Sequence, residues 1–226
     1  MPQSMLIYQE LPAAASVATV IALHAEGGDV DQLLPFADRL GPQYQLIAPQ
    51  GARPTNPATQ GYVANQGYLW FFIQEVGHPE PATFGESLWL LDRFICDVRE
   101  RQGQDRPVFL VGYEQGAVLA VTLAMVVPEL LAGVVAINGY LPDIPGWSPP
   151  VEDAQGLPVL LVHDPGDGAL PAELVERTAV RLTERHAASE VRAVATAGRD
   201  PLAAADATRE WIAGQLARRQ ASTPTT

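Results

Sequence analysis

The sequence predicts an α/β protein built on a mostly parallel β-sheet with helices on both faces. Apolar, β-branched runs alternate with amphipathic segments along the chain, which is the pattern of such a sheet. The 226 residues, 47% hydrophobic and 18% charged, suit one domain that can bury a full sheet. One apolar run also passes through a glycine-flanked turn directly into an apolar helix. We therefore expect a single domain over residues 1–219 and a polar, disordered tail over residues 220–226.

The expected strands are short apolar runs separated by turns or by segments of helical periodicity. In chain order they cover residues 5–9, 16–24, 45–48, 107–113, 133–138, 158–164 and 191–196. The helical spacing of apolar residues predicts helices over residues 30–40, 82–102, 115–127, 170–186 and 201–219. Gly41 and Pro42 end the first of these helices.

A long segment rich in Gly, Pro and Asn, residues 49–81, follows the third expected strand. Loops of this length in a compact domain are usually functional. This one carries several aromatic rings that could form a wall for an apolar substrate: Tyr62, Tyr68, Trp70, Phe71 and Phe72. The alternative for some of them is that they anchor the loop to the core. His78 is a candidate to reach the site, although packing is the commoner role of such a histidine.

Charge and composition exclude several classes of function. The net charge of −12 and the lack of a basic stripe argue against nucleic acid, whose phosphates require clustered Lys and Arg. The single cysteine, Cys96, excludes an internal disulfide and a cysteine metal cluster. Gly27 and Gly28 lack the rest of a phosphate-loop pattern. We expect neither a metal nor a cofactor.

The sequence shows neither a membrane-spanning segment nor a targeting signal. The longest apolar run, residues 117–127, is too short to span a bilayer. The first residues lack the basic and apolar regions of a signal peptide, so the expected location is the cytoplasm. An apolar stretch over residues 141–147 suits either a pocket wall or an interface, which leaves a homodimer open.

The motif with the clearest chemical meaning lies between the fourth expected strand and the third expected helix. Gly112-Tyr-Glu-Gln-Gly116 has the order of a nucleophile elbow. In such an elbow the central residue lies on a strained turn, and small residues two positions away let strand and helix approach. Both glycines are present, but the central residue is Glu114 instead of Ser.

Four further motifs, together with the elbow, resemble the phospholipase/carboxylesterase branch of the α/β-hydrolases over nearly the whole chain. They are Leu23-His-Ala-Glu-Gly-Gly28, Gly67-Tyr-Leu-Trp-Phe71, His163-Asp-Pro-Gly-Asp167 and Gly198-Arg199. They match, in order, the family's glycine-rich segment after an early strand, its Trp-Phe substrate loop, the motif of the triad acid and the Gly-His of the triad base. The resemblance implies a three-layer α/β-hydrolase fold.

The resemblance also implies roles for the matching positions. The acid of the catalytic triad is present as Asp167, while Glu114 stands at the nucleophile position and Arg199 at that of the histidine. Ala25, followed by Glu26, stands where the family has its oxyanion-side glycine. The remaining expected contacts to substrate are the backbone N–H groups near Glu26 and Gln115, which do not depend on the side chain, and the rings of Tyr68, Trp70 and Phe71.

The usual esterase mechanism needs a hydroxyl nucleophile and an imidazole base, and neither stands at the matching positions. Arginine stays protonated and cannot replace the base. The first hypothesis is therefore general acid/base catalysis by Glu26 and Glu114, with one carboxyl kept protonated by burial and by its neighbour. Cyclisation, isomerisation, dehydration or ring opening of a small, mainly apolar molecule would fit.

Two alternatives remain open. Arg199 could bridge Glu114 and Asp167 in an ion network that holds the pocket, so that the protein binds a ligand or partner without turnover. Glu114 could also attack carbon as a carboxylate nucleophile. The lack of a histidine to activate water for the second step, and the length of Glu relative to Asp, count against this last hypothesis.

Overall fold

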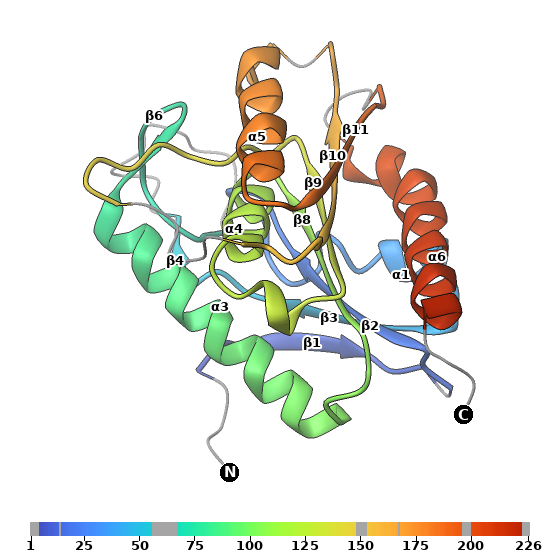
Figure 1. Cartoon of the computed structure of the whole chain (residues 1–226). Helices are drawn as coiled ribbons and strands as arrows, with labels where there is room; N and C mark the ends of the chain where they lie inside the picture. The colour runs from blue at the N-terminus through green and yellow to red at the C-terminus, as the bar shows by residue number, and fades with distance from the viewer. Residues whose placement is uncertain are drawn as a thin grey trace.

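The computed structural model describes residues 5–13, 15–55, 67–147, 153–166, 168–195 and 200–222, and it confirms the predicted fold class. Figure 1 shows a central sheet with helices on both sides. Across the main sheet the strands follow the order β1 (Tyr8–Leu11), β3 (Tyr44–Pro49), β2 (Ala18–Leu23), β8 (Val108–Tyr113), β9 (Gly133–Ile137), β10 (Pro158–His163) and β11 (Ala188–Ala193). Only the β1–β3 pair is antiparallel among these neighbours.

Different helices cover the two faces of the sheet. On one face lie α1 (Phe36–Leu40) and α6 (Ala205–Ser222), and on the other lie α3 (Pro81–Gln102), α4 (Gln115–Ala124) and α5 (Ala172–Glu184). Short 3-10 helices cover Pro128–Leu130 and Pro201–Ala204. Among the described residues, none of the helices is long and apolar enough to cross a bilayer.

Each of the five inner strands of the main sheet, β3, β2, β8, β9 and β10, divides its side chains between two hydrophobic cores. In β2, Val20 and Ala22 pack with the α1–α6 layer, while Ile21 and Leu23 pack with the α3–α4–α5 layer. This alternation is the two-residue period of a strand buried on both faces. The parallel order also brings the carboxyl ends of β2, β8, β9 and β10 to one edge of the sheet, which is where ligands bind in open α/β folds.

The first helix differs most from its prediction over residues 30–40. Helical structure begins only at Phe36, and the preceding residues form turns with hydrogen bonds such as that from the Gln32 N–H to the Asp29 carbonyl, at 3.3 Å. Pro35 explains the late start, because a proline disfavours the helical conformation of the residue before it. At the other end of the chain, α6 runs to Ser222, so residues 220–222 are helical and do not belong to a tail.

The described parts of the long loop are not structureless. Two short antiparallel pairs cross it: β4 (Arg53–Pro54) with β5 (Tyr68–Leu69), and β6 (Ile73–Glu75) with β7 (His78–Pro79). Tyr62 lies outside the described residues. The second pair forms a hairpin before α3, and it reaches the carboxyl edge of the sheet through its contacts with the segment after β9.

Candidate functional site

Glu114 lies on a strained turn between β8 and α4. Its backbone has φ 48° and ψ −111°, which costs on the order of 1–3 kcal/mol for a residue with a side chain. Two backbone hydrogen bonds hold the turn. The Glu114 N–H donates to the Ile137 carbonyl at 3.0 Å, and the Glu114 carbonyl accepts from the Val118 N–H at 3.0 Å. The strand and helix on either side therefore impose the conformation of this residue.

The two glycines of the elbow are required because three backbones meet there. A Cβ atom at Gly112 would lie 2.3 Å from the Gly116 carbonyl oxygen, and one at Gly116 would lie 2.1 Å from the Leu23 carbonyl oxygen. Both distances are far shorter than any van der Waals contact. The backbone thus has the close strand–helix approach expected of a nucleophile elbow, with a glutamate at its tip.

His24, at the end of β2, connects three segments of the site. Its Nε2 accepts the Gly51 N–H at 2.8 Å, so the proton of the neutral ring is on Nδ1, which lies 2.7 Å from the Ala25 carbonyl. The ring also stacks on Trp70, with 4.9 Å between centroids. Burial lowers the pKa of His24 to about 4, which outweighs the hydrogen bond to Ala25. His24 is therefore a neutral structural residue.

Gln115, the first residue of α4, holds the loop after β2 against the aromatic loop. Its Oε1 accepts the Trp70 N–H at 3.0 Å, and its Nε2 donates to the Phe71 carbonyl at 3.1 Å and to Glu26 Oε2 at 3.0 Å. The two backbone groups fix which end of the amide is which. Glu26 Oε2 must therefore act as the acceptor, and a proton on this carboxyl belongs on Oε1.

The loop after β2 is also fastened directly to the aromatic loop. The Gly27 N–H donates to the Tyr68 carbonyl at 2.9 Å, and the Tyr68 N–H donates to the Gly28 carbonyl at 2.7 Å. The N–H of Ala25 is used by Gln32 Oε1 at 2.7 Å. In contrast, no acceptor for the backbone N–H of Glu26 or of Gln115 is found among the described residues. These are the two donors that the sequence predicts for an oxyanion.

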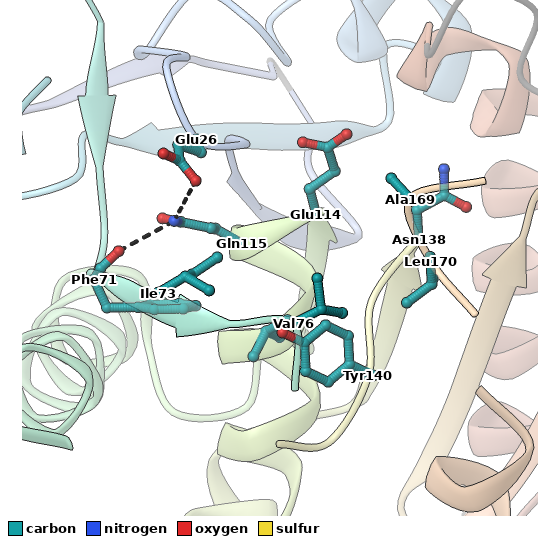
Figure 2. A pocket seen from close by; sticks show the side chains of 11 residues that line it. Glu26, Phe71, Ile73, Val76, Glu114, Gln115, Asn138, Tyr140, Ala169 and Leu170 are labelled. Carbon is teal, nitrogen blue, oxygen red and sulfur yellow. Dashed lines mark hydrogen bonds between the residues drawn. The ribbon is translucent and has the colours of Figure 1, made fainter. Parts of the chain in front are cut away.

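A pocket of about 140 Å³ opens beside the elbow. Its lining combines two carboxylates with mostly apolar groups: Glu26, Phe71, Ile73, Val76, Glu114, Gln115, Val118, Asn138, Tyr140, Ala169 and Leu170. Figure 2 shows the carboxyl groups of Glu26 and Glu114 in the upper part of the view, above Ile73, Val76 and Tyr140. The pocket therefore has an acidic side and an apolar side.

Glu26 is exposed at the rim of this pocket, yet its carboxyl is partly covered by protein. Burial raises the pKa of Glu26, and the hydrogen bond from Gln115 opposes the rise. Glu26 as a whole residue is exposed, whereas its carboxyl group is partly buried, so the two quantities disagree on whether the charge is shielded from water. The direction of the shift follows the carboxyl, because only its surroundings change the cost of the charge. The sequence hypothesis assigned part of such a rise to a neighbouring carboxylate, whereas the cause of the rise in the pKa of Glu26 is burial, and the Gln115 hydrogen bond opposes it.

A family model for phospholipases and carboxylesterases matches residues 9–198. The chain belongs to the phospholipase/carboxylesterase family. It has no significant similarity to any curated protein.

Solved structures share the fold of this chain over almost its whole length. A carboxylesterase from Mesorhizobium loti is 23% identical, with a TM-score of 0.78, over 92% of this chain and 95% of that one. A Bacillus cereus carboxylesterase is 18% identical, with a TM-score of 0.76, over 94% and 95%. A protein of unknown function from Agrobacterium tumefaciens is 21% identical, with a TM-score of 0.76, over 95% and 100%. At these identities the similarity shows the fold alone.

The α/β-hydrolase site brings together four of the residues predicted from the sequence: Glu26, Phe71, Glu114 and Gln115 line the pocket. Two others, Asp167 and Arg199, lie outside the described residues, so their predicted roles stay predictions. Ala25 is buried next to the rim and does not belong to the described lining.

The remaining three aromatic candidates, Tyr68, Trp70 and His78, do not belong to the described lining of this pocket. Trp70 is 1% exposed, and its indole N–H donates to the His24 carbonyl at 2.9 Å, so it anchors the loop. Tyr68 contributes backbone hydrogen bonds. The His78 ring lies in β7, where its buried Nδ1 is 3.3 Å from Glu75 Oε1 without hydrogen-bond geometry.

Sequence reasoning missed the residues that follow β9. Asn138 and Tyr140 line the pocket, and the Asn138 Oδ1 accepts the Asp164 N–H at 3.0 Å. Their position directly after a central parallel strand could have identified them, because such strand ends converge at the ligand site of this fold. Among the described residues, no group of three or more His, Cys, Asp or Glu side chains could hold a metal ion.

Proposed function

We propose that this family member binds a small, mainly apolar molecule in the pocket beside the elbow and converts it by carboxylate acid/base chemistry. The observation that carries the proposal is Glu114 itself. A residue that the backbone forces into a strained conformation, at the edge of an apolar pocket, is typical of a functional position. The sequence supplies no hydroxyl at residue 114 for the mechanism usual in this family.

The two carboxyl groups take different roles in this proposal. Glu26 is the acid, because burial raises its pKa and the hydrogen bond from Gln115 leaves Oε1 as the oxygen that carries the proton. Glu114 is the base or the stabiliser of developing positive charge. The substrate is not an anion, since both carboxylates and the net charge of −12 oppose one. Ring opening, isomerisation, dehydration or cyclisation remain the matching reactions.

The apolar side of the site supports a mainly apolar substrate. Phe71, Val118 and Leu170 contribute buried walls, while Ile73 and Val76 are 41% and 56% exposed at the mouth. An engineered cavity of about 150 Å³ in another protein accepts benzene. A pocket of about 140 Å³ therefore suits a molecule, or a part of one, of about that size.

The test is turnover of small neutral epoxides, enol ethers and cyclic alkenols, followed by gas chromatography. We expect the wild type to convert at least one of them and Glu114→Gln to lose roughly 10²- to 10⁴-fold in rate. We also expect the acid-assisted rate to fall as the pH rises through the pKa of Glu26, because deprotonation removes the acid. Turnover that Glu114→Gln leaves unchanged would contradict the proposal.

A double variant, Glu114→Ser with Arg199→His, provides the matched control. It restores a serine and a histidine at the family positions, so it should hydrolyse p-nitrophenyl butyrate faster than the wild type while losing the wild-type reaction. Wild-type hydrolysis at the rate of the double variant would argue against a changed chemistry.

The non-catalytic alternative predicts a different result for Glu114→Gln. If Glu114 mainly serves an ion network with Arg199 and Asp167, its neutralisation should lower stability by roughly 3–5 kcal/mol, since it would leave a buried charge without its partner. A thermal unfolding curve of the same variant separates the two readings. A small change in stability with a large loss of turnover supports catalysis.

A further inference from the structure

Tyr140 is a buried pocket residue that the proposed chemistry does not use. It lies three residues after the end of β9, is 6% exposed and contributes to the pocket lining. The segment that follows it is fixed to α5. The Leu141 N–H donates to Thr178 Oγ1 at 2.8 Å, and Arg181 donates to the Leu141 carbonyl at 3.1 Å. Tyr140 is therefore held in place independently of any ligand.

The Tyr140 hydroxyl accepts one hydrogen bond but donates none to the described residues. Its oxygen accepts the Gly77 N–H at 3.1 Å, and Gly77 follows Val76, which also lines the pocket. Among the described residues, none accepts a hydrogen bond from the hydroxyl in return. Burial raises the pKa of Tyr140, so the group stays protonated and remains a donor at neutral pH.

The oxygen of this hydroxyl is satisfied by Gly77, while its O–H can still donate one hydrogen bond. Figure 2 places Tyr140 beside Val76, on the other side of the pocket from the carboxyl group of Glu114. The hydroxyl thus lies where the β6–β7 hairpin meets the apolar side of the pocket. The carboxyl groups of Glu26 and Glu114 lie in the upper part of the same view, away from Tyr140.

We propose that the Tyr140 hydroxyl donates a hydrogen bond to a carbonyl or ether oxygen of the ligand, and so selects uncharged, ring-sized apolar molecules that carry such an acceptor. This inference rests on the proposed use of the pocket but does not require turnover. It divides the site into an anchoring side at Tyr140 and a reacting side at Glu26 and Glu114. A substrate would then carry its acceptor oxygen at a different end from the group that reacts.

The experiment uses two probes of nearly the same shape, cyclohexanone and methylenecyclohexane, which differ in having an oxygen or a CH₂ at one position. Each is titrated into the full-length protein, and binding is followed by NMR through the methyl resonances of Val118 and Leu170, which all three proteins keep. Three proteins are compared: the wild type, Tyr140→Phe and Val76→Ala. The last removes apolar contact from the same wall and leaves the hydroxyl in place.

The expected result is a selective loss. In Tyr140→Phe the affinity ratio of cyclohexanone to methylenecyclohexane should fall roughly 2- to 13-fold, which corresponds to one neutral hydrogen bond. Methylenecyclohexane should still bind this variant as it binds the wild type, which also shows that the pocket has folded. Val76→Ala should weaken both probes and leave their ratio unchanged.

Two outcomes would overturn the inference, and they can be told apart. If both probes bind but Tyr140→Phe leaves their ratio unchanged, Tyr140 does not select the ligand, while the proposed use of the pocket stands. If neither probe shifts the methyl resonances of the wild type, the pocket does not take small neutral molecules, and the proposed function fails with the inference.

Discussion

Two polar clusters at the carboxyl edge of the sheet differ in how completely the protein satisfies them. Around His24, both ring nitrogens are used by backbone groups and the ring face by Trp70. In the pocket, the Oε1 of Glu26 and the proton of Tyr140 have no hydrogen-bond partner among the described residues. A polar side chain with every position occupied by backbone is part of the scaffold. One that keeps a position open toward a cavity can still pair with water or with a ligand.

The largest expected effect is the loss of the scaffold cluster. His24→Phe keeps a ring beside Trp70 but leaves the buried Gly51 N–H without its acceptor. We expect stability to fall by roughly 2–5 kcal/mol, measured by urea unfolding at pH 7.5. His186→Asn, which changes a histidine whose side chain is 72% exposed, should change stability by less than about 0.5 kcal/mol. If the two substitutions changed stability equally, His24 would contribute no more to stability than a surface histidine.

The same cluster should also make stability depend on pH. Because the folded pKa of His24 is about 4 and the model value is 6.5, protons bind the unfolded chain better between these values. Stability due to this group is therefore complete above pH 6.5 and is lost as the pH falls. The destabilisation caused by His24→Phe should shrink by roughly 3 kcal/mol between pH 7.5 and pH 4. A difference that stays constant over this range would show that His24 is not held neutral.

A smaller effect is expected for Gln115, which connects the two clusters. Gln115→Met keeps the length of the side chain but removes the partners of the Trp70 N–H and the Phe71 carbonyl, at a cost of roughly 1–3 kcal/mol. The pKa of Glu26 should rise further in this variant, because the hydrogen bond that opposes the effect of burial is gone. A titration of the Glu26 carboxyl by ¹³C NMR measures this directly. An unchanged pKa would mean that the Gln115 contact does not act on Glu26.

The smallest expected effect on stability comes from Glu26. Glu26→Gln alters a residue at the exposed rim and should change the unfolding free energy by no more than about 0.5 kcal/mol at neutral pH. The difference in unfolding free energy between the wild type and Glu26→Gln should depend on pH. Since the folded pKa of Glu26 is raised, the wild type loses stability relative to the variant as the pH rises through that pKa. Urea midpoints at pH 4 and pH 8 test the direction, and a relative gain at pH 8 would contradict it.

The sequence predicted the sheet and the elbow because both leave strong local patterns. Buried parallel strands are nearly continuous apolar runs, and the elbow needs glycines at Gly112 and Gly116 for reasons of backbone contact alone. The short strand pairs of the long loop left no such pattern, because strands such as Tyr68–Leu69 have only two residues and show no period. Glu114 could be placed from the sequence, since its position follows from the turn.

The roles of single aromatic rings could not be predicted in the same way. The sequence shows that Trp70 and Phe71 are adjacent, but adjacent residues in an irregular segment have no fixed relative direction. Trp70 points to His24 and anchors the loop, while Phe71 lines the pocket. The hydrogen bond between Tyr140 and Gly77 could not be predicted for the related reason that the two residues lie far apart in the chain. Such pairings depend on tertiary contact and not on local pattern.

The elbow backbone has a consequence for how residue 114 could change over evolutionary time. Since the turn is fixed by its neighbours, every side chain with a Cβ meets the same strain there, and only glycine would relieve it. A glutamate codon becomes a glycine codon through one nucleotide substitution. A chain with no use for this position thus has a more stable sequence one step away.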